Sequence, residues 1–238
     1  MKSKMKTEIQ IIEHNKNKII YTQLSDSFLL TSDTVLLTDF IDLSHNKNKI
    51  ILDVGTGQGL IPLLLSTKTN NKIYGIEIQK KLVQIAKLNI QDNNLNNQIE
   101  IIEDKFQNCQ KYFSPNSIDI VVANPPYFKI NENRKMSISI SKAISRHEVE
   151  INFDEISLYA SKIMKQNGHF YFIQRTERFV EILATLKKYN LEPKRIKFIY
   201  YNKSSLSSLF LVDATYYGKS GLKIESPIFL ESEEKNEK

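Results

Sequence analysis

The sequence predicts an α/β fold with a mostly parallel sheet, helices on both faces and an antiparallel hairpin near the C-terminus. An apolar run at 50–54 leads into a glycine-rich loop, as expected for a buried parallel strand that turns into a helix. Strand-like and helix-like segments then alternate along the chain. The last two expected strands, 195–201 and 207–214, are joined only by Asn202-Lys203-Ser204-Ser205. Because that turn is too short for a crossover, these two strands must be antiparallel neighbours.

Length and charge limit the possible classes of protein. The 238 residues, 41% of them hydrophobic, suit one domain spanning 1–238. The net charge is +6, and the acidic tail 231–238 holds four glutamates against two lysines, so residues 1–230 carry +8. A basic body favours a polyanionic partner such as RNA.

Other classes of protein are disfavoured by what the sequence lacks. The single cysteine, Cys109, permits no internal disulfide, and no Cys/His cluster suggests a metal site. There is no apolar run of membrane-spanning length, and the first residues lack the apolar core of a secretory signal. We therefore expect a cytoplasmic protein with no metal, no membrane association and no obligate protein partner.

Residues 1–48 are expected to form an N-terminal extension and a helix that packs on the site. Two short apolar runs, 9–12 and 19–21, indicate either a hairpin or a loose extended lead-in. Thr31, Ser32 or Asp33 can then cap a helix whose apolar residues 36, 37, 40 and 41 share one face.

The glycine loop after the first core strand indicates a nucleotide-like ligand. Gly55, Gly57 and Gly59 let the backbone turn sharply, and Leu60 stands where a dinucleotide-binding loop would place its third glycine. With Asp53 two positions before Gly55, the loop resembles that of class I S-adenosylmethionine (SAM) methyltransferases. A structural turn of some other α/β protein is the alternative.

The next elements each end in a candidate ligand residue. A helix follows the loop, with Pro62 in its first turn, and strand 72–78 places Glu77 18 residues after Gly59. A carboxylate there can accept both ribose hydroxyls of a nucleoside, although it could be a surface acid. After helix 79–93 and strand 98–103, Asp104 is the expected partner of an adenine amino group, or else an exposed turn acid.

Asn124-Pro125-Pro126-Tyr127 follows the fourth strand, 118–123, at the edge where open α/β sheets bind ligands. The prolines make the loop stiff and extended. A delocalised amine is a poor nucleophile, and two acceptors for its N–H groups would hold it toward a methyl donor. The Asn124 side-chain oxygen and the Pro125 carbonyl can be these acceptors, and Tyr127 can stack on a flat base. A merely rigid turn is the alternative.

The polar stretch 128–147 is predicted to be a mobile basic lid that contacts RNA phosphates, with a solvated loop as the alternative. Its predicted RNA-binding residues are Lys129, Arg134, Lys135, Lys142 and Arg146. His147 is expected to have a positioning or salt-bridge role. Helix 153–166 should start at an Asn152/Glu155 capping box and stop at Asn167-Gly168, before strand 168–173 and helix 176–189.

Six segments, spread over about residues 20 to 230, together resemble the bacterial valine-tRNA adenine-N6 methyltransferases. They are Asp33-Thr34-Val35-Leu36-Leu37, the loop Asp53 to Gly59 with the helix after it, Gly75-Ile76-Glu77-Ile78-Gln79, Asn124-Pro125-Pro126-Tyr127, Ser145-Arg146-His147-Glu148 and Leu191-Glu192-Pro193-Lys194-Arg195-Ile196. Thr34 departs from the Gly or Ala usual in that family, and the lid is exceptionally rich in Ser, Ile and Lys.

The resemblance implies a seven-stranded class I methyltransferase sheet, SAM as cofactor and tRNA as substrate, with methylation of the adenosine 3′ of the anticodon. It implies catalytic residues Asn124, Pro125, Pro126 and Tyr127. The implied cofactor contacts are Asp33, Asp53, Gly55, Thr56, Gly57, Gly59, Glu77, Ile78, Asp104 and Asn124.

Three other functions stay open. A glutamine methyltransferase acting on release factors shares the Asn-Pro-Pro-Tyr motif, but the 48 residues before the first core strand are too few and too strand-like for its helical substrate domain. An rRNA base or DNA adenine is a second possible target. A non-catalytic RNA-binding module is disfavoured because a pure binder gains nothing from the intact Gly, Glu and Asn positions.

Overall fold

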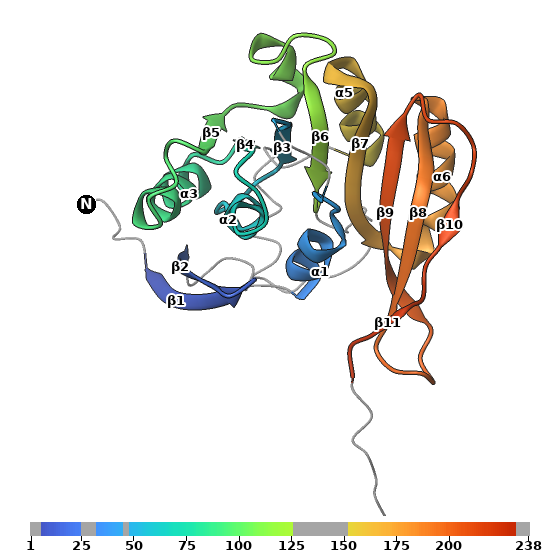
Figure 1. Cartoon of the computed structure of the whole chain (residues 1–238), viewed down its shortest axis with the longest axis horizontal. Coiled ribbons are helices and arrows are strands. Elements are labelled where there is room, and N and C mark those ends of the chain that lie inside the picture. Colours follow the sequence, from blue (N-terminus) through green and yellow to red (C-terminus); the bar gives the residue numbers. More distant parts are fainter. Residues whose placement is uncertain (1–5, 25–31, 45–47, 126–151, 232–238) are drawn as a thin grey trace, which may run out of the picture.

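The computed structural model describes residues 6–24, 32–44, 48–125 and 152–231, and a nine-stranded sheet lies at its centre (Figure 1). Its strand order is β5-β4-β3-β6-β7-β9-β8-β10, and β11 also pairs with β8. The strands are β3 (Ile50–Val54), β4 (Lys72–Glu77), β5 (Ile99–Glu103), β6 (Ile118–Ala123), β7 (Met164–Arg175), β8 (Leu191–Tyr200), β9 (Ser207–Tyr216), β10 (Lys223–Ile224) and β11 (Ile228–Phe229).

The directions of the strands confirm the predicted fold class. β5, β4, β3, β6 and β7 run parallel, whereas β9 is antiparallel to both β7 and β8. These are the seven predicted strands, with the C-terminal hairpin in place. The two-residue strands β10 and β11 extend the sheet beyond β8, and both are parallel to it.

Helices cover both faces of the sheet. They are α1 (Ser32–Phe40), α2 (Leu60–Ser66), α3 (Lys80–Asp92), α5 (Phe153–Ile163) and α6 (Phe179–Lys188), with 3-10 turns η1 (Phe106–Lys111) and η2 (Thr176–Arg178). Side chains of α1, α2 and α3 form one core cluster, and those of η1, α5 and α6 form the other. The central strand β3 contributes to both, because Ile51 faces the first cluster and Leu52 the second. None of the helices in the described ranges is long and apolar enough to span a membrane.

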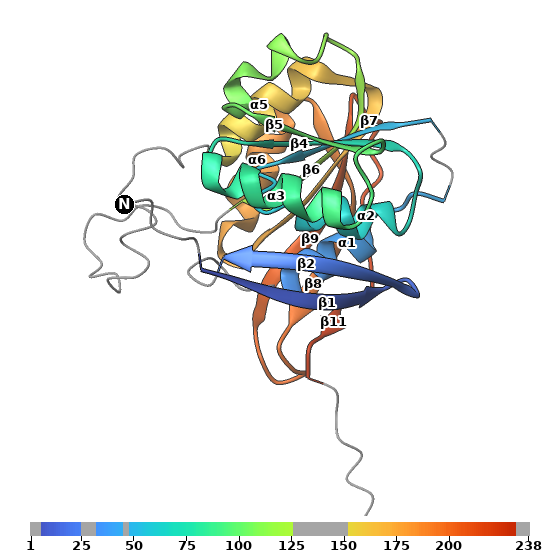
Figure 2. The same ribbon diagram turned by 90° about the vertical axis from the view of Figure 1, so that its left-hand side faces the viewer.

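A separate two-stranded hairpin, β1 (Thr7–His14) and β2 (Asn17–Leu24), lies beside α3 and α2 (Figure 2). The hairpin interpretation of the N-terminal runs is therefore confirmed. His14, at the end of β1, contacts α1 and the C-cap of α2, since its ring nitrogens lie 2.9 Å from Asp39 Oδ1 and 2.8 Å from Thr67 Oγ1.

Side-chain amides pair with the edge of β2 that faces away from β1. Asn93 accepts from Ile20 N at 2.9 Å and donates to Ile20 O at 2.7 Å. Asn89 does the same with Thr22, at 2.7 and 2.9 Å, and Gln58 of the glycine loop accepts from Leu24 N at 2.7 Å. We call Asn93, Asn89 and Gln58 the amide ladder. It satisfies backbone groups that an edge strand would otherwise leave unpaired.

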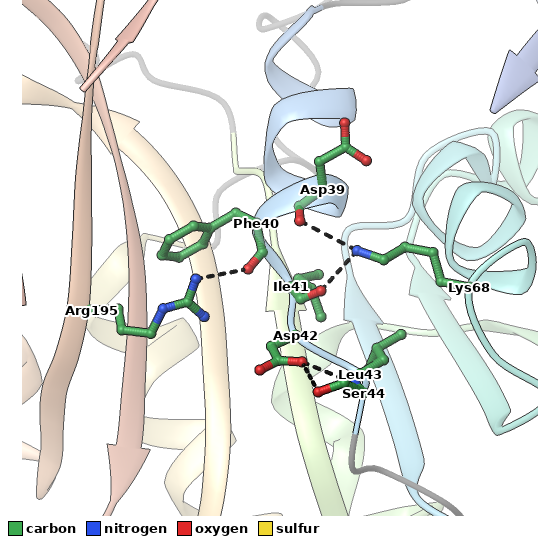
Figure 3. A pocket seen from close by; sticks show the side chains of 8 residues that line it. All are labelled: Asp39, Phe40, Ile41, Asp42, Leu43, Ser44, Lys68 and Arg195. Atoms are coloured by element: carbon green, nitrogen blue, oxygen red, sulfur yellow. Dashed lines mark hydrogen bonds between the residues drawn. The ribbon is translucent and has the colours of Figure 1, made fainter. Parts of the chain in front are cut away.

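Cationic side chains hold the C-terminal end of α1. Lys68 donates to the carbonyls of Thr38, Asp39 and Ile41, at 2.7, 3.4 and 2.8 Å, and so supplies partners for a helix end. Figure 3 shows the contacts with Asp39 and Ile41. Arg195 stacks over the Phe40 ring, with its Cζ 4.3 Å from the ring centroid. A hollow of about 500 Å³ lies between these groups. The two cationic side chains that line this hollow, Lys68 and Arg195, hold α1 against the end of α2 and against β8.

Two predicted details were wrong. Helix α5 ends at Ile163 instead of 166, and β7 begins at Met164. The Asn167-Gly168 pair forms an irregularity inside the strand instead of a helix stop: Asn167 has φ of 62°, and a Cβ on Gly168 would lie 2.8 Å from the Lys165 carbonyl oxygen. The Asn152/Glu155 capping box is confirmed.

Candidate active site

Strand register brings three of the predicted site segments to one edge of the sheet. Val54 of β3 lies opposite Ile76 of β4 and opposite Ala123 of β6. The residue that follows each of these, namely Gly55, Glu77 and Asn124, therefore emerges at the same carboxyl edge. Open α/β sheets bind their ligands at this edge.

The glycine loop is a backbone cradle that only glycine adopts readily. Gly55, Gly57 and Gly59 have φ of 70°, 57° and 83°, in the left-handed region. Gly55 N and Thr56 N both donate to the Ile76 carbonyl, at 2.9 and 3.1 Å, which anchors the loop to β4. A Cβ on Gly59 would lie 3.3 Å from Ala86 Cβ, so this glycine also permits close packing on α3.

Glu77 links the loop to the start of α3. Its Oε2 accepts from Gly57 N at 3.0 Å, and its Oε1 accepts from Gln79 N at 2.8 Å. Burial raises the pKa of this carboxyl group, and the backbone donors at Gln79 and Gly57 oppose the rise. A carboxylate has about four lone-pair sites, so each oxygen retains the capacity to accept from a ligand hydroxyl.

Asp53 lies beneath the loop and is fully buried. Within the described ranges, no group donates a well-aligned hydrogen bond to either of its carboxylate oxygens. Burial raises its pKa to about 7; the negative charge of Glu77 adds to the rise, and the Thr56 hydroxyl opposes it. An orphaned buried carboxylate under a glycine cradle is a feature that a cationic ligand group would stabilise.

The raised pKa of Asp53 predicts how stability depends on pH in the absence of ligand. The folded state holds the proton up to about pH 7, whereas an unfolded aspartate releases it near pH 4. The folded state thus binds more protons between these values, and the free energy of unfolding falls as pH rises, by up to about 1.4 kcal/mol per pH unit.

Asp53→Asn should reduce the decrease in the free energy of unfolding between about pH 4 and pH 7, because asparagine is neutral in both the folded and the unfolded state. Urea unfolding of the wild type and the variant at pH 4.5 and pH 7.5 would measure it. If the wild type and the variant differ in free energy of unfolding by the same amount at both pH values, the prediction is wrong.

Asp104 has a local structural role that the sequence did not predict. Its carboxylate accepts from Lys105 N and Asn108 Nδ2, each at 2.7 Å, and from the Tyr112 hydroxyl at 2.8 Å. These donors, Asn108 first, hold the pKa of the carboxyl below its usual range. The residue therefore fastens η1 to the end of β5, and its contact with an adenine amino group stays a prediction.

Asn124 and Pro125 leave β6 at this edge, and the Asn124 side chain meets helix α1. Its Nδ2 donates to Thr34 Oγ1 at 3.1 Å, which brings the N-terminal helix against the Asn-Pro motif. Asp33, one residue earlier, is half-buried on the same helix. Helix α1 therefore contacts the Asn-Pro segment, and its packing on a ligand site stays a prediction.

The remaining predicted site residues divide into two groups. Thr56 is buried in the loop, and Ile78 is half-buried directly after Glu77. Pro126, Tyr127 and the basic lid 128–147, with Lys129, Arg134, Lys135, Lys142, Arg146 and His147, lie outside the described residues, as does 232–238 of the acidic tail.

The structure adds residues that the sequence analysis did not place at the site. Thr34 was noted only as a departure from the resemblance, and Gln58 was not singled out. Asn89 is buried on an otherwise apolar helix face, where it also donates to Gln58 O at 2.9 Å. A buried asparagine four residues from Asn93 is the signal that could have indicated the amide ladder.

A parallel sheet with this strand order, a glycine cradle and an acidic strand end on the neighbouring strand together define a class I, Rossmann-like methyltransferase fold. Comparison with known families agrees. The chain belongs to the methyltransferase-domain family, whose members match it over residues 45–197.

Individual proteins similar to this chain indicate more specific activities than the family does. A tRNA1(Val) (adenine(37)-N6)-methyltransferase of Phocaeicola vulgatus is 28% identical over 73% of this chain and 71% of its own length. One of the same name from Cytophaga hutchinsonii is 28% identical over 66% of this chain and 64% of its own length. A relative from Methanocaldococcus jannaschii, with the provisional name protein N5-glutamine methyltransferase, is 34% identical over 54% of this chain and 58% of its own length.

Solved structures share the fold. The crystal structure of a predicted O-methyltransferase from Agrobacterium tumefaciens superposes with a TM-score of 0.68 and 17% identity, covering 86% of this chain and 90% of that one.

Proposed function

We propose that this protein transfers a methyl group from SAM to N6 of an adenosine in tRNA, the adenosine 3′ of the anticodon of tRNA(Val). The observation that carries the proposal is the position of the Asn124-Pro125 segment. It lies at the same sheet edge as the glycine cradle, with its amide fixed against helix α1. The relatives named for this reaction support the choice of substrate.

The described residues fit SAM. The left-handed glycines at 55 and 57 leave backbone room for a ligand, since a Cβ on either would meet no atom within 4 Å. Glu77 would hold the ribose hydroxyls, and the orphaned carboxylate of Asp53 suits a ligand that brings positive charge. When bound, SAM supplies an electrophilic methyl group.

The protein's own contribution is to orient the amine. The lone pair of an adenine amino group is delocalised into the ring, so the amine reacts only when it is held in a suitable geometry. Oδ1 of Asn124 and the carbonyl of Pro125 would each accept one N–H, which aligns the nitrogen and stabilises positive charge as it develops there. Prolines make this loop stiff, so the acceptors are fixed before the substrate arrives.

The substrate side of the site rests on residues outside the described ranges. Tyr127 would stack on the extruded base, and the cationic residues Lys129, Arg134, Lys135, Lys142 and Arg146 would contact RNA phosphates. The basic charge of residues 1–230 is consistent with that partner.

A glutamine side chain is the second candidate acceptor, favoured by the 34% identical relative with that provisional name. A glutamine amide, like an adenine amine, needs two acceptors for its N–H groups. The relatives named for the adenine reaction align over 73% and 66% of this chain, whereas this relative aligns over 54%. We therefore favour the adenine reaction.

Tritium transfer from labelled SAM tests the proposal. We expect label in an unmodified tRNA(Val) transcript and background label in a transcript whose adenosine 3′ of the anticodon is replaced by guanosine. A glutamine-containing release-factor domain serves as the third substrate. Equal label in the two transcripts, or label in the protein alone, would refute the proposed substrate.

A further inference from the structure

Thr34 joins helix α1 to the Asn-Pro motif through a side-chain hydrogen bond. Asn124 Nδ2 donates to Thr34 Oγ1 at 3.1 Å, although the two residues are 90 positions apart in the sequence. Thr34 is 8% exposed, so little water competes for this contact. The hydroxyl therefore acts on the orientation of the Asn124 amide.

The two ends of an amide have opposite chemistry. Nδ2 only donates and Oδ1 only accepts. Because Nδ2 is committed to Thr34, an amine that approaches Asn124 from the opposite side meets Oδ1. The reverse orientation would present N–H to N–H and would repel the substrate amine instead of holding it.

Helix α1 is firmly anchored, so Thr34 is a fixed reference point. Lys68 binds three carbonyls at the C-terminal end of α1, and Arg195 stacks on Phe40 (Figure 3). A polar group on a rigid element can position a catalytic side chain to within a few tenths of an ångström.

We propose that Thr34 is a positioning residue for methyl transfer, which sets the Asn124 amide so that Oδ1 accepts an N–H of the substrate amine. This inference rests on the proposed function. It adds the Thr34 hydroxyl, from a helix far away in the sequence, to the groups that act with the Asn-Pro-Pro-Tyr motif.

Thr34→Val removes the hydroxyl and nearly preserves the shape of the side chain. We expect single-turnover methylation of the tRNA(Val) transcript to fall about 3- to 10-fold, the value of one hydrogen bond. The Kd for SAM and the KM for tRNA should change less than two-fold. Thr34→Ser keeps the hydroxyl and should retain the wild-type rate within about two-fold. Unchanged methylation in Thr34→Val would overturn the inference.

Thr38→Val is the matched control. It removes a hydroxyl from the same helix one turn away, where the side chain is fully buried. If it lowers the rate as much as Thr34→Val does, the effect comes from the helix and the inference fails. In an Asn124→Ala background, Thr34→Val should cause no further loss of rate, since the group that it positions is gone. The same fold-loss in both backgrounds would also overturn the inference.

A double-mutant cycle on unfolding separates the inference from the proposed function, because it needs no substrate. Thr34→Val, Asn124→Ala and the double variant should show coupling between the two positions in urea unfolding. Coupling together with a wild type that is inactive on the transcript overturns the proposed substrate alone. Absence of coupling in a protein that methylates the transcript overturns the Thr34 inference alone.

Discussion

Replacing Asn124 with alanine is expected to lower single-turnover methylation of tRNA(Val) by about a hundred-fold or more while SAM binding is retained. The side chain would contact the amine as the new bond forms, so its loss removes stabilisation of the transition state more than ground-state binding. Charged contacts should still hold the RNA. Rapid-quench transfer of tritium from labelled SAM, at saturating enzyme, measures the rate.

Asn124→Asp separates the role of acceptor from that of donor. Aspartate keeps an oxygen toward the substrate but cannot donate to Thr34 as Nδ2 does. We expect its rate to lie between those of the wild type and Asn124→Ala, with most of the calorimetric SAM binding retained in both variants. Full activity in Asn124→Ala would refute the mechanism.

Glu77→Ala should weaken SAM binding about ten- to a hundred-fold, the value of two charge-assisted hydrogen bonds to a ribose. Gly57 N and Gln79 N would also lose their shared acceptor, which loosens the glycine cradle that they fix. Both effects act in the same direction on affinity. Isothermal titration of SAM into the purified variant gives the Kd directly.

Glu103 offers a matched control for Glu77. It lies directly opposite Glu77 in the β4–β5 register and is exposed. Glu103→Ala should leave the SAM Kd within about two-fold of the wild type. If both glutamate variants lose affinity equally, or if Glu77→Ala binds normally, the assignment of the ribose to Glu77 is wrong.

Sequence patterns predicted the central architecture because short-range rules decide it. Glycines at 55, 57 and 59 demand a left-handed loop whatever surrounds them, and an apolar strand of five residues must be buried on both faces. The short turn at 202–205 could only join antiparallel strands. Such features depend on neighbours within a few positions of one another.

The features that the sequence did not reveal depend on contacts between distant segments. Nothing near Thr34 indicates that its hydroxyl meets Asn124, and nothing near Gln58 indicates that its side chain pairs with Leu24. The end of α5 was misplaced because Asn-Gly is a common helix stop, whereas Gly168 is needed for its close approach to the Lys165 carbonyl. The complete burial of Asp53 likewise depends on neighbours from distant segments, which no local pattern indicates.

The amide ladder pairs a helix with a strand, and the two elements have different rises per residue. Four residues of helix advance about 6 Å, and two residues of strand advance about 7 Å, so Asn93 and Asn89 on α3 can match Ile20 and Thr22. The next helix position in that series is the apolar Ile85, and the accumulated mismatch grows with each step. The third rung comes instead from Gln58, within the glycine loop. The register of β2 is therefore set by two separate elements, helix α3 and the glycine loop. Inserting or deleting a single residue in β2 would disrupt its pairing with these elements.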